Sequence, residues 1–88
     1  MININDNIYI KKYMGTKLSA DTSEIYVINN IYTFSCKNSL NNIVYEKRAI
    51  LNNGKEQLIY TYDIITKKRT YYVEKVPFWY HKLLCCCI

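Results

Sequence analysis

Runs of β-branched and aromatic residues, separated by asparagine-rich turns, constrain the fold of this chain more than any other feature. Asn52-Asn53-Gly54 predicts a hairpin with a type I′ turn, because Asn-Gly readily adopts positive φ angles. Asn29-Asn30 and residues 38–42 are further predicted turns. The strands predicted around these turns are residues 24–28, 31–36, 43–46, 57–63 and 70–74. We therefore expect a mainly β domain, built as an antiparallel sheet or as a partial or small β-barrel.

The length and composition indicate one folded domain. The chain has 88 residues, half of them hydrophobic and ten of them tyrosine, which is typical of a chain that folds rather than of a disordered one. We expect residues 1–20 to form an N-terminal segment with one candidate strand at residues 8–10. Residues 21–78 are predicted to form the antiparallel β domain, and residues 79–88 an aromatic, cysteine-rich tail that anchors to a membrane.

Three of the four cysteines, Cys85, Cys86 and Cys87, are adjacent at the C-terminus. Adjacent cysteines pair poorly with one another because a disulfide needs a particular Cα separation, and they lack the C-x₂-C spacing of a zinc site. We predict that these cysteines carry lipid, either by S-acylation or by prenylation of Cys85 through the terminal box ending at Ile88. A ragged end of a short reading frame is the alternative that the sequence leaves open.

Basic and aromatic residues precede these cysteines. The predicted membrane contacts are Lys67, Lys68, Arg69, Phe78, Trp79, Tyr80, Lys82, Leu83 and Leu84. The formal charge of +5 suits an anionic membrane surface as partner. The chain shows no signal peptide, no stretch of roughly 20 apolar residues and no secreted disulfide framework, so we expect the cytoplasmic face of a membrane. The alternatives are a solvated turn at residues 67–69 and a terminal strand or helical turn at residues 79–84 that covers the sheet.

The strand-turn-strand of residues 32–46 resembles that of the phospholipid scramblase family, which has a Tubby-like β-barrel. The similarity extends more loosely through Tyr62-Asp63 and through residues 73–78, whose Val-Pro-Phe stands near the family's Arg-Pro-Phe. Cys85, Cys86 and Cys87 then stand about where the family has its palmitoylated segment. This resemblance covers roughly residues 25–87 and implies a β domain with a phospholipid-related binding or structural role, acting in lipid scrambling as part of an assembly.

Several features of the scramblase family have no equivalent in this chain. The family's arginine is Val76 here, and the family's twelve-strand barrel surrounds a central helix in two similar halves, whereas this chain corresponds only to the first half. The calcium-binding segment of the family has no counterpart in this sequence. Because half a barrel presents an open edge, we expect a homodimer, a partner that completes the barrel, or a curled sheet with the N-terminal strand folded across it.

Catalysis finds little support in the sequence. His81 is the only histidine, the carboxylates are scattered singly, and no phosphate-binding loop is present, so we assign no catalytic residue, metal ligand or cofactor. One alternative function rests on Tyr60, Tyr62, Tyr71 and Tyr72, which with intervening basic residues could stack the bases of single-stranded nucleic acid. We regard that alternative as less favoured than membrane association. A further alternative is a truncated remnant or a protein-interaction module without activity.

Overall fold

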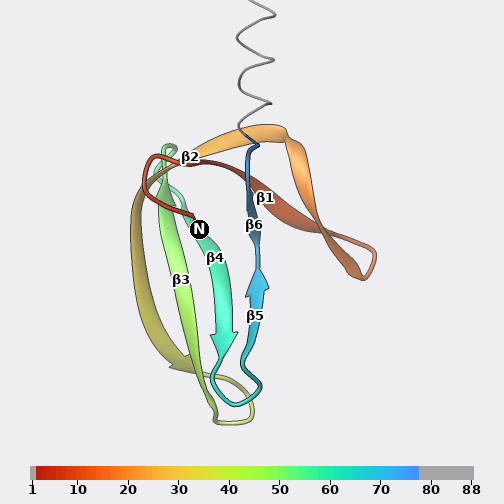
Figure 1. Cartoon of the computed structure of the whole chain (residues 1–88), viewed down its shortest axis with the longest axis vertical. Coiled ribbons are helices and arrows are strands. Elements are labelled where there is room, and N and C mark those ends of the chain that lie inside the picture. The colour runs from red at the N-terminus through yellow and green to blue at the C-terminus, as the bar shows by residue number, and fades with distance from the viewer. Residues whose placement is uncertain (1, 78–88) are drawn as a thin grey trace, which may run out of the picture.

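The computed structural model describes residues 2–77, which form one antiparallel sheet nearly closed into a barrel (Figure 1). The strands are β1 (Asn7–Met14), β2 (Lys17–Lys37), β3 (Ile43–Leu51), β4 (Glu56–Asp63), β5 (Lys68–Tyr71) and β6 (Val73–Lys75). Their order in the sheet is β5-β4-β3-β2-β1-β6, and every neighbouring pair is antiparallel. The predicted mainly β, antiparallel, barrel-like fold is confirmed.

Strand β2 is long and bent, and it belongs to both sides of the barrel. Its first half pairs with β1, and its second half pairs with β3. Between the pairs Ile8–Tyr26 and Ile10–Asp21, residues 22–25 of β2 lie opposite a single residue of β1, so the strand bulges there. A second irregularity falls at Asn29. The predicted turn at Asn29-Asn30 is therefore wrong, because these asparagines bend a continuous strand instead of reversing it.

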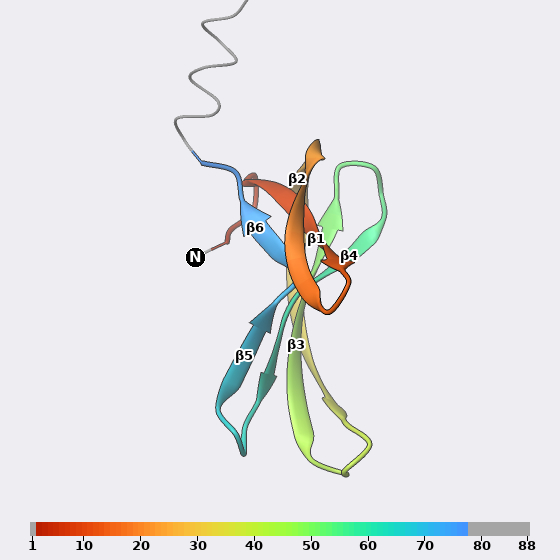
Figure 2. The same cartoon turned by 90° about the vertical axis from the view of Figure 1, so that its right-hand side faces the viewer.

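The segment from β5 to β6 closes the barrel. Strand β5 pairs with β4, and β6 pairs with β1, so two consecutive short strands occupy the edges at the two ends of the meander (Figure 2). Tyr72 joins them: its N–H donates to the carbonyl of Ile59 at 2.8 Å, and its carbonyl accepts from the N–H of Lys11 at 2.9 Å. We expected a homodimer or a completing partner because half a barrel would leave an open edge. In the structure, β5 and β6 occupy the edges of β4 and β1. The oligomeric state itself stays a prediction.

The barrel has a small apolar core. It consists of the buried side chains Ile8, Ile28, Ala49, Leu51, Ile59 and Val73. Ile2, Ile10, Tyr26, Ile31 and Tyr60 pack against it while keeping part of their surface exposed. The candidate strand at residues 8–10 lies inside β1 and supplies Ile8 to this core, so β1 is part of the barrel's sheet.

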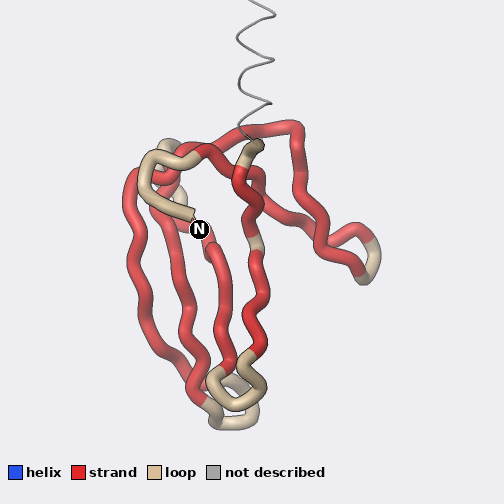
Figure 3. The backbone as a smooth tube through the Cα atoms, viewed as in Figure 1, coloured by secondary structure: helices blue, strands red, loops and turns tan. Residues whose placement is uncertain are grey.

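The loops lie at the ends of the strands (Figure 3). The hairpin predicted at Asn52-Asn53-Gly54 is present, but its turn is not type I′, which requires positive φ at both central residues. Only Gly54 has positive φ (+82°), and its N–H donates to the carbonyl of Leu51 at 2.9 Å. The loop therefore has three residues, a common hairpin form in which the glycine occupies the left-handed position.

Candidate functional site: an aromatic and basic inner face

Three tyrosines and two cations gather on one face of strands β3, β4 and β5. Tyr60 and Tyr62 alternate along β4 and so share a face, while Lys47 of β3 is the register partner of Tyr60. On β5, Tyr71 is paired with Tyr60 and Arg69 with Tyr62. Directly opposite residues in antiparallel strands project to the same side. We call Lys47, Tyr60, Tyr62, Arg69 and Tyr71 the inner-face cluster.

This face continues the side of the sheet that forms the core. Ala49 and Leu51 are buried, and Lys47 precedes them at the same two-residue period on β3. Tyr60 packs against the core from β4. The cluster therefore lies where the inner side of the barrel emerges from the core towards the β4–β5 loop.

The two cations lie over tyrosine rings. The Cζ of Arg69 is 4.8 Å from the ring centroid of Tyr60 and 5.3 Å from that of Tyr62. The Nζ of Lys47 lies 5.8 Å from the Tyr60 centroid. These distances fall within the roughly 6 Å range of a cation–π contact. The hydroxyl of Tyr71, as a hydrogen-bond partner, raises the pKa of Arg69 above its ordinary value, so the guanidinium is fully charged.

A pocket of about 280 Å³ opens within the cluster. It is lined by Ile2, Lys47, Ile59, Tyr60, Arg69 and Tyr71. Ile59 and Ile2 supply apolar surface, and the cations and phenol rings supply the rest. Small-molecule sites usually measure roughly 300–1,000 Å³, so this pocket suits one ring or one charged group of a larger ligand.

Neither cation of the cluster forms an ion pair among residues 2–77. The four salt bridges of that part of the chain involve Lys12, Arg48 twice and Lys75. Neighbouring carboxylates on the same strands, Glu46 and Asp63, alternate onto the outer face of the sheet. The inner-face cluster therefore presents positive charge that no carboxylate of the described chain neutralises by direct contact.

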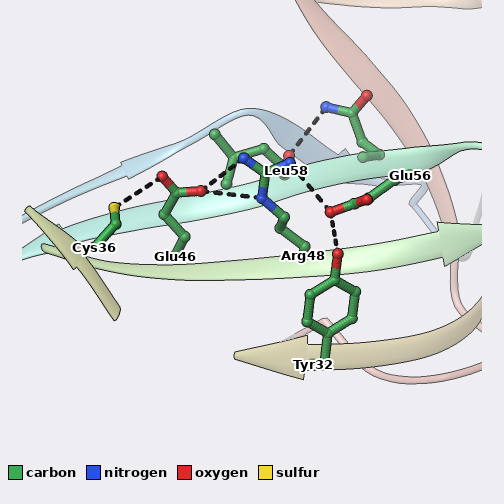
Figure 4. Close-up of polar contacts among 7 residues, drawn as sticks. Tyr32, Cys36, Glu46, Arg48, Glu56 and Leu58 are labelled. Atoms are coloured by element: carbon green, nitrogen blue, oxygen red, sulfur yellow. Dashed lines mark hydrogen bonds and ion pairs between the residues drawn. The ribbon is translucent and has the colours of Figure 1, made fainter. Parts of the chain in front are cut away.

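On the outer face, in contrast, the cation Arg48 forms ion pairs with carboxylates (Figure 4). The Nη2 of Arg48 lies 2.8 Å from Oε1 of Glu46, and its Nη1 lies 3.1 Å from Oε1 of Glu56. The Tyr32 hydroxyl donates to Glu56, and the Cys36 thiol donates to Oε2 of Glu46 at 3.3 Å. We call these five residues the outer-face network. Its single cation meets two carboxylates, so this network has no spare positive charge for an anion.

The outer-face network shifts the ionisation of its members. The hydrogen bond from Tyr32, followed by contact with Arg48, lowers the pKa of Glu56. The carboxylate of Glu46 raises the pKa of Cys36, because a thiolate would lose the hydrogen bond and face a negative charge. Cys36 is thus a protonated donor with little nucleophilic character at neutral pH.

The predicted site residues are only partly brought together. Tyr60, Tyr62 and Tyr71 cluster as the stacking hypothesis requires, whereas Tyr72 lies beyond the end of β5 and does not line the pocket within the cluster. Arg69, predicted as a membrane contact, lies over Tyr60 and Tyr62 instead of at the loop. Lys67 and Lys68 are exposed at the β4–β5 loop.

The remaining predicted residues lie outside the described residues: Phe78, Trp79, Tyr80, Lys82, Leu83, Leu84, Cys85, Cys86 and Cys87. The described chain ends just after β6, at the opposite end of the barrel from the β4–β5 loop (Figure 1). The eight residues from Lys68 to Lys75 span roughly 25 Å as strand, which separates the basic loop from the point where the described chain ends.

Lys47 is the member of the site that sequence reasoning missed. It is separated from Tyr60 by the Asn52-Asn53-Gly54 hairpin, and simple counting across that hairpin could have paired the two strands. An irregularity in the β3–β4 pairing next to Lys47 shifts the register by one residue, which no local sequence signal marks.

Within residues 2–77 no three His, Cys, Asp or Glu side chains are grouped to hold a metal ion. The same residues include no helix with the length and apolar character needed to cross a membrane. Compared with known proteins, the chain matches no family model, and no curated protein or solved structure is significantly similar to it.

Proposed function

We propose that the inner-face cluster binds single-stranded nucleic acid. The observation that carries the proposal is the position of Lys47 and Arg69 over the rings of Tyr60 and Tyr62, without a carboxylate partner in the described chain. Proteins that bind single strands without sequence preference combine a positive groove with aromatic rings on which bases stack. The cluster supplies both components on one face of a small β-barrel.

The size of the pocket favours a polymer over a small free ligand. About 280 Å³ accommodates one base, and the flanking rings of Tyr62 and Tyr71 offer further stacking surface along the same face. Each stacked base contributes roughly 1–3 kcal/mol by alanine substitution, so two or three contacts are needed for useful affinity. A strand that lies along β4 and β5 can make them together.

The test is a filter-binding titration of the full chain against a fluorescent oligothymidylate over a range of salt concentrations. The double variant Lys47→Gln/Arg69→Gln removes both cations. Lys17→Gln/Lys55→Gln removes the same charge from exposed positions outside the cluster and serves as the control. We expect the first variant to bind at least about tenfold more weakly and its salt slope to fall by about 1.4, the value for two phosphate contacts on a single strand.

The control variant should retain both the affinity and most of the slope of the original protein. Equal weakening of the two double variants would show that only net charge matters and would reject the site. Absence of binding by the unaltered protein at low salt would reject the function. Thermal unfolding of each variant establishes that the comparison is made on folded protein.

A second candidate is attachment to a cytosolic membrane surface through lipid on Cys85, Cys86 and Cys87. One observation favours it: β5 and β6 already occupy the edges of β4 and β1, so closing the barrel does not require residues 78–88. The test is the triple change of these cysteines to serine, which should lower the fraction of the protein that is bound to cell membranes. Hydroxylamine should release the unaltered protein if the bonds are thioesters and leave it attached if Cys85 is prenylated.

The scramblase-like role is a proposal supported by the sequence resemblance of residues 25–87. It would be supported by accelerated movement of labelled phospholipid between vesicle leaflets on addition of the lipidated protein. Unchanged lipid movement with protein on the membrane would favour a binding or protein-interaction role instead.

A further inference from the structure

Two loops at the same end of the barrel expose large aliphatic side chains. The β2–β3 loop carries Leu40, which is 76% exposed, and leads into Ile43 at the start of β3. The β4–β5 loop carries Ile64 and Ile65, and Ile65 is 66% exposed. Both loops lie at the lower end of the molecule in the two perpendicular views (Figures 1 and 2). We call these four residues and the loops that bear them the loop end.

The sheet itself brings the two loops together. Val44 and Asp63 are register partners at the last pair of the β3–β4 ladder. Ile43 and Ile64 are the next residues along the two strands, so their backbones leave the sheet side by side. The exposed side chains of both loops therefore lie at the same end of the barrel (Figures 1 and 2).

Side-chain caps hold both loops in shape. The Oδ1 of Asn38 accepts hydrogen bonds from the N–H groups of Leu40 and Asn42, both at 3.0 Å. The Oδ1 of Asp63 accepts from the N–H groups of Ile65 at 2.9 Å and Thr66 at 3.3 Å. Because the backbone is already ordered, a partner that buries Leu40 and Ile65 loses little additional conformational entropy.

Three lysines lie on or beside these two loops. Lys37 ends β2, Lys67 lies in the β4–β5 loop and Lys68 begins β5; all three are exposed. None of the three is in a salt bridge within the part of the chain that the structure covers. The nearest carboxylate in sequence, Asp63, is engaged by loop N–H groups. The loop end thus combines exposed apolar side chains with three lysines, of which Lys68 has the carboxylate of Asp63 as its register partner without forming a salt bridge.

We infer that the loop end is a docking surface for an anionic lipid bilayer, which it engages without any covalent lipid. Leu40 and Ile65 enter the boundary between headgroups and acyl chains, while Lys37, Lys67 and Lys68 contact lipid phosphates. Charge complementarity selects this partner, because three exposed lysines lie on or beside the two loops that expose the aliphatic side chains. This inference is independent of the nucleic-acid proposal, which concerns the inner face.

The first experiment is co-sedimentation of the unlipidated full chain with phosphatidylcholine vesicles, with and without phosphatidylserine. The variant Leu40→Ser/Ile65→Ser removes two of the exposed aliphatic side chains. The matched control, Tyr13→Ser/Met14→Ser, removes two exposed apolar groups from the β1–β2 hairpin, which lies away from the loop end. We expect the loop-end variant to lower the partition coefficient at least about tenfold on phosphatidylserine vesicles, since each buried methylene contributes measurably. The control should bind as the original does.

The second experiment locates the contact. In a background with all four cysteines replaced by serine, an environment-sensitive dye is attached at Leu40→Cys or at Met14→Cys. A blue shift with anionic vesicles at position 40 and none at position 14 supports the inference. Vesicle binding that the loop-end variant leaves unchanged, or a blue shift only at position 14, overturns it. Binding by the unaltered chain that is indifferent to phosphatidylserine also overturns it, because the three lysines then contribute nothing.

Discussion

Tyr60 and Tyr71 meet edge to face across strands β4 and β5, with ring centroids 5.4 Å apart and an interplanar angle of 61°. The pairing is direct, because the two residues are register partners. Such aromatic pairs contribute roughly 0.5–1.5 kcal/mol beyond the area they bury. Tyr60 and Tyr71 therefore stabilise the pairing of β4 with β5 and also belong to the inner-face cluster.

Tyr71→Ala is expected to weaken binding of single-stranded nucleic acid by roughly 1–3 kcal/mol, because one stacking surface is lost. It should also destabilise the fold by about 1 kcal/mol through loss of the aromatic pair. Tyr13→Ala, which changes an exposed tyrosine on the β1–β2 hairpin, is the matched control and should leave binding unchanged. Urea unfolding and filter binding on the same samples separate the two effects. Unchanged affinity with lowered stability would assign Tyr71 to structure alone.

Acid should destabilise the protein partly through Glu56. Its pKa is lowered in the folded state by the hydrogen bond from Tyr32 and by Arg48, so the ionised carboxylate stabilises the fold above its unfolded pKa, near 4.5. This contribution is lost as the pH falls below that value. Glu56→Gln is therefore expected to be less stable than the original at neutral pH, with the two unfolding curves converging in acid.

The control for this pH profile is Glu74→Gln, which removes an exposed carboxylate outside the outer-face network. Chemical denaturation at a series of pH values gives the free energy of unfolding for each protein. A constant difference between Glu56→Gln and the original, independent of pH, would contradict the assignment of the acid sensitivity to this carboxylate.

Cys36 should react slowly with iodoacetamide at neutral pH. Its pKa is raised by the hydrogen bond to Glu46 and by burial, so little thiolate is present. In a background with Cys85, Cys86 and Cys87 changed to serine, Glu46→Gln is expected to move the pH midpoint of alkylation downwards and to speed the reaction. A midpoint that does not move would show that burial, not the carboxylate, controls the thiol.

The positive φ angle of Gly54, and not the size of the new side chain, should determine how well a substitution there is tolerated. No atom lies within 4 Å of the place that a β-carbon would occupy there, and φ is +82°. Gly54→Ala is expected to cost about 1 kcal/mol from the left-handed backbone alone. Gly54→Asn should cost less, since asparagine tolerates this region better. Thermal unfolding with Lys55→Ala as control measures the difference, and equal costs for alanine and asparagine would argue against a left-handed residue 54.

Local patterns predicted the strands well because alternation and turn composition act over short stretches. Residues 43–46, 57–63 and 70–74 all fall in or across observed strands, and the Asn-Gly hairpin is where it was expected. The turn predicted at Asn29-Asn30 was wrong because asparagine occurs in bulges as well as in turns. Whether a bulge or a turn forms there depends on the pairing of β2 with β3. Such pairing is a property of the whole sheet.

The candidate site was half predictable. The sequence hypothesis named four tyrosines, at positions 60, 62, 71 and 72, with basic residues between them, and three of the four gather in the cluster. Lys47 joins them only through a shifted β3–β4 register. The closing contact of β6 with β1 joins segments from opposite ends of the described chain, and no neighbouring residues signal it. The aliphatic loop end was also missed, since Leu40 and Ile65 each look like ordinary loop residues until the two loops are placed together.

The pairing of Ile8 with Lys75 has a consequence for biosynthesis. Strand β1 leaves the ribosome early, whereas β6 is synthesised almost at the end of the described chain. Until β6 emerges, the nascent chain can build the β1-to-β4 meander but must leave one backbone edge of β1 without its final neighbour. Non-local pairings of this kind are slow to form, so a translational pause before Val73 would prolong exposure of that edge to chaperones and to other nascent chains.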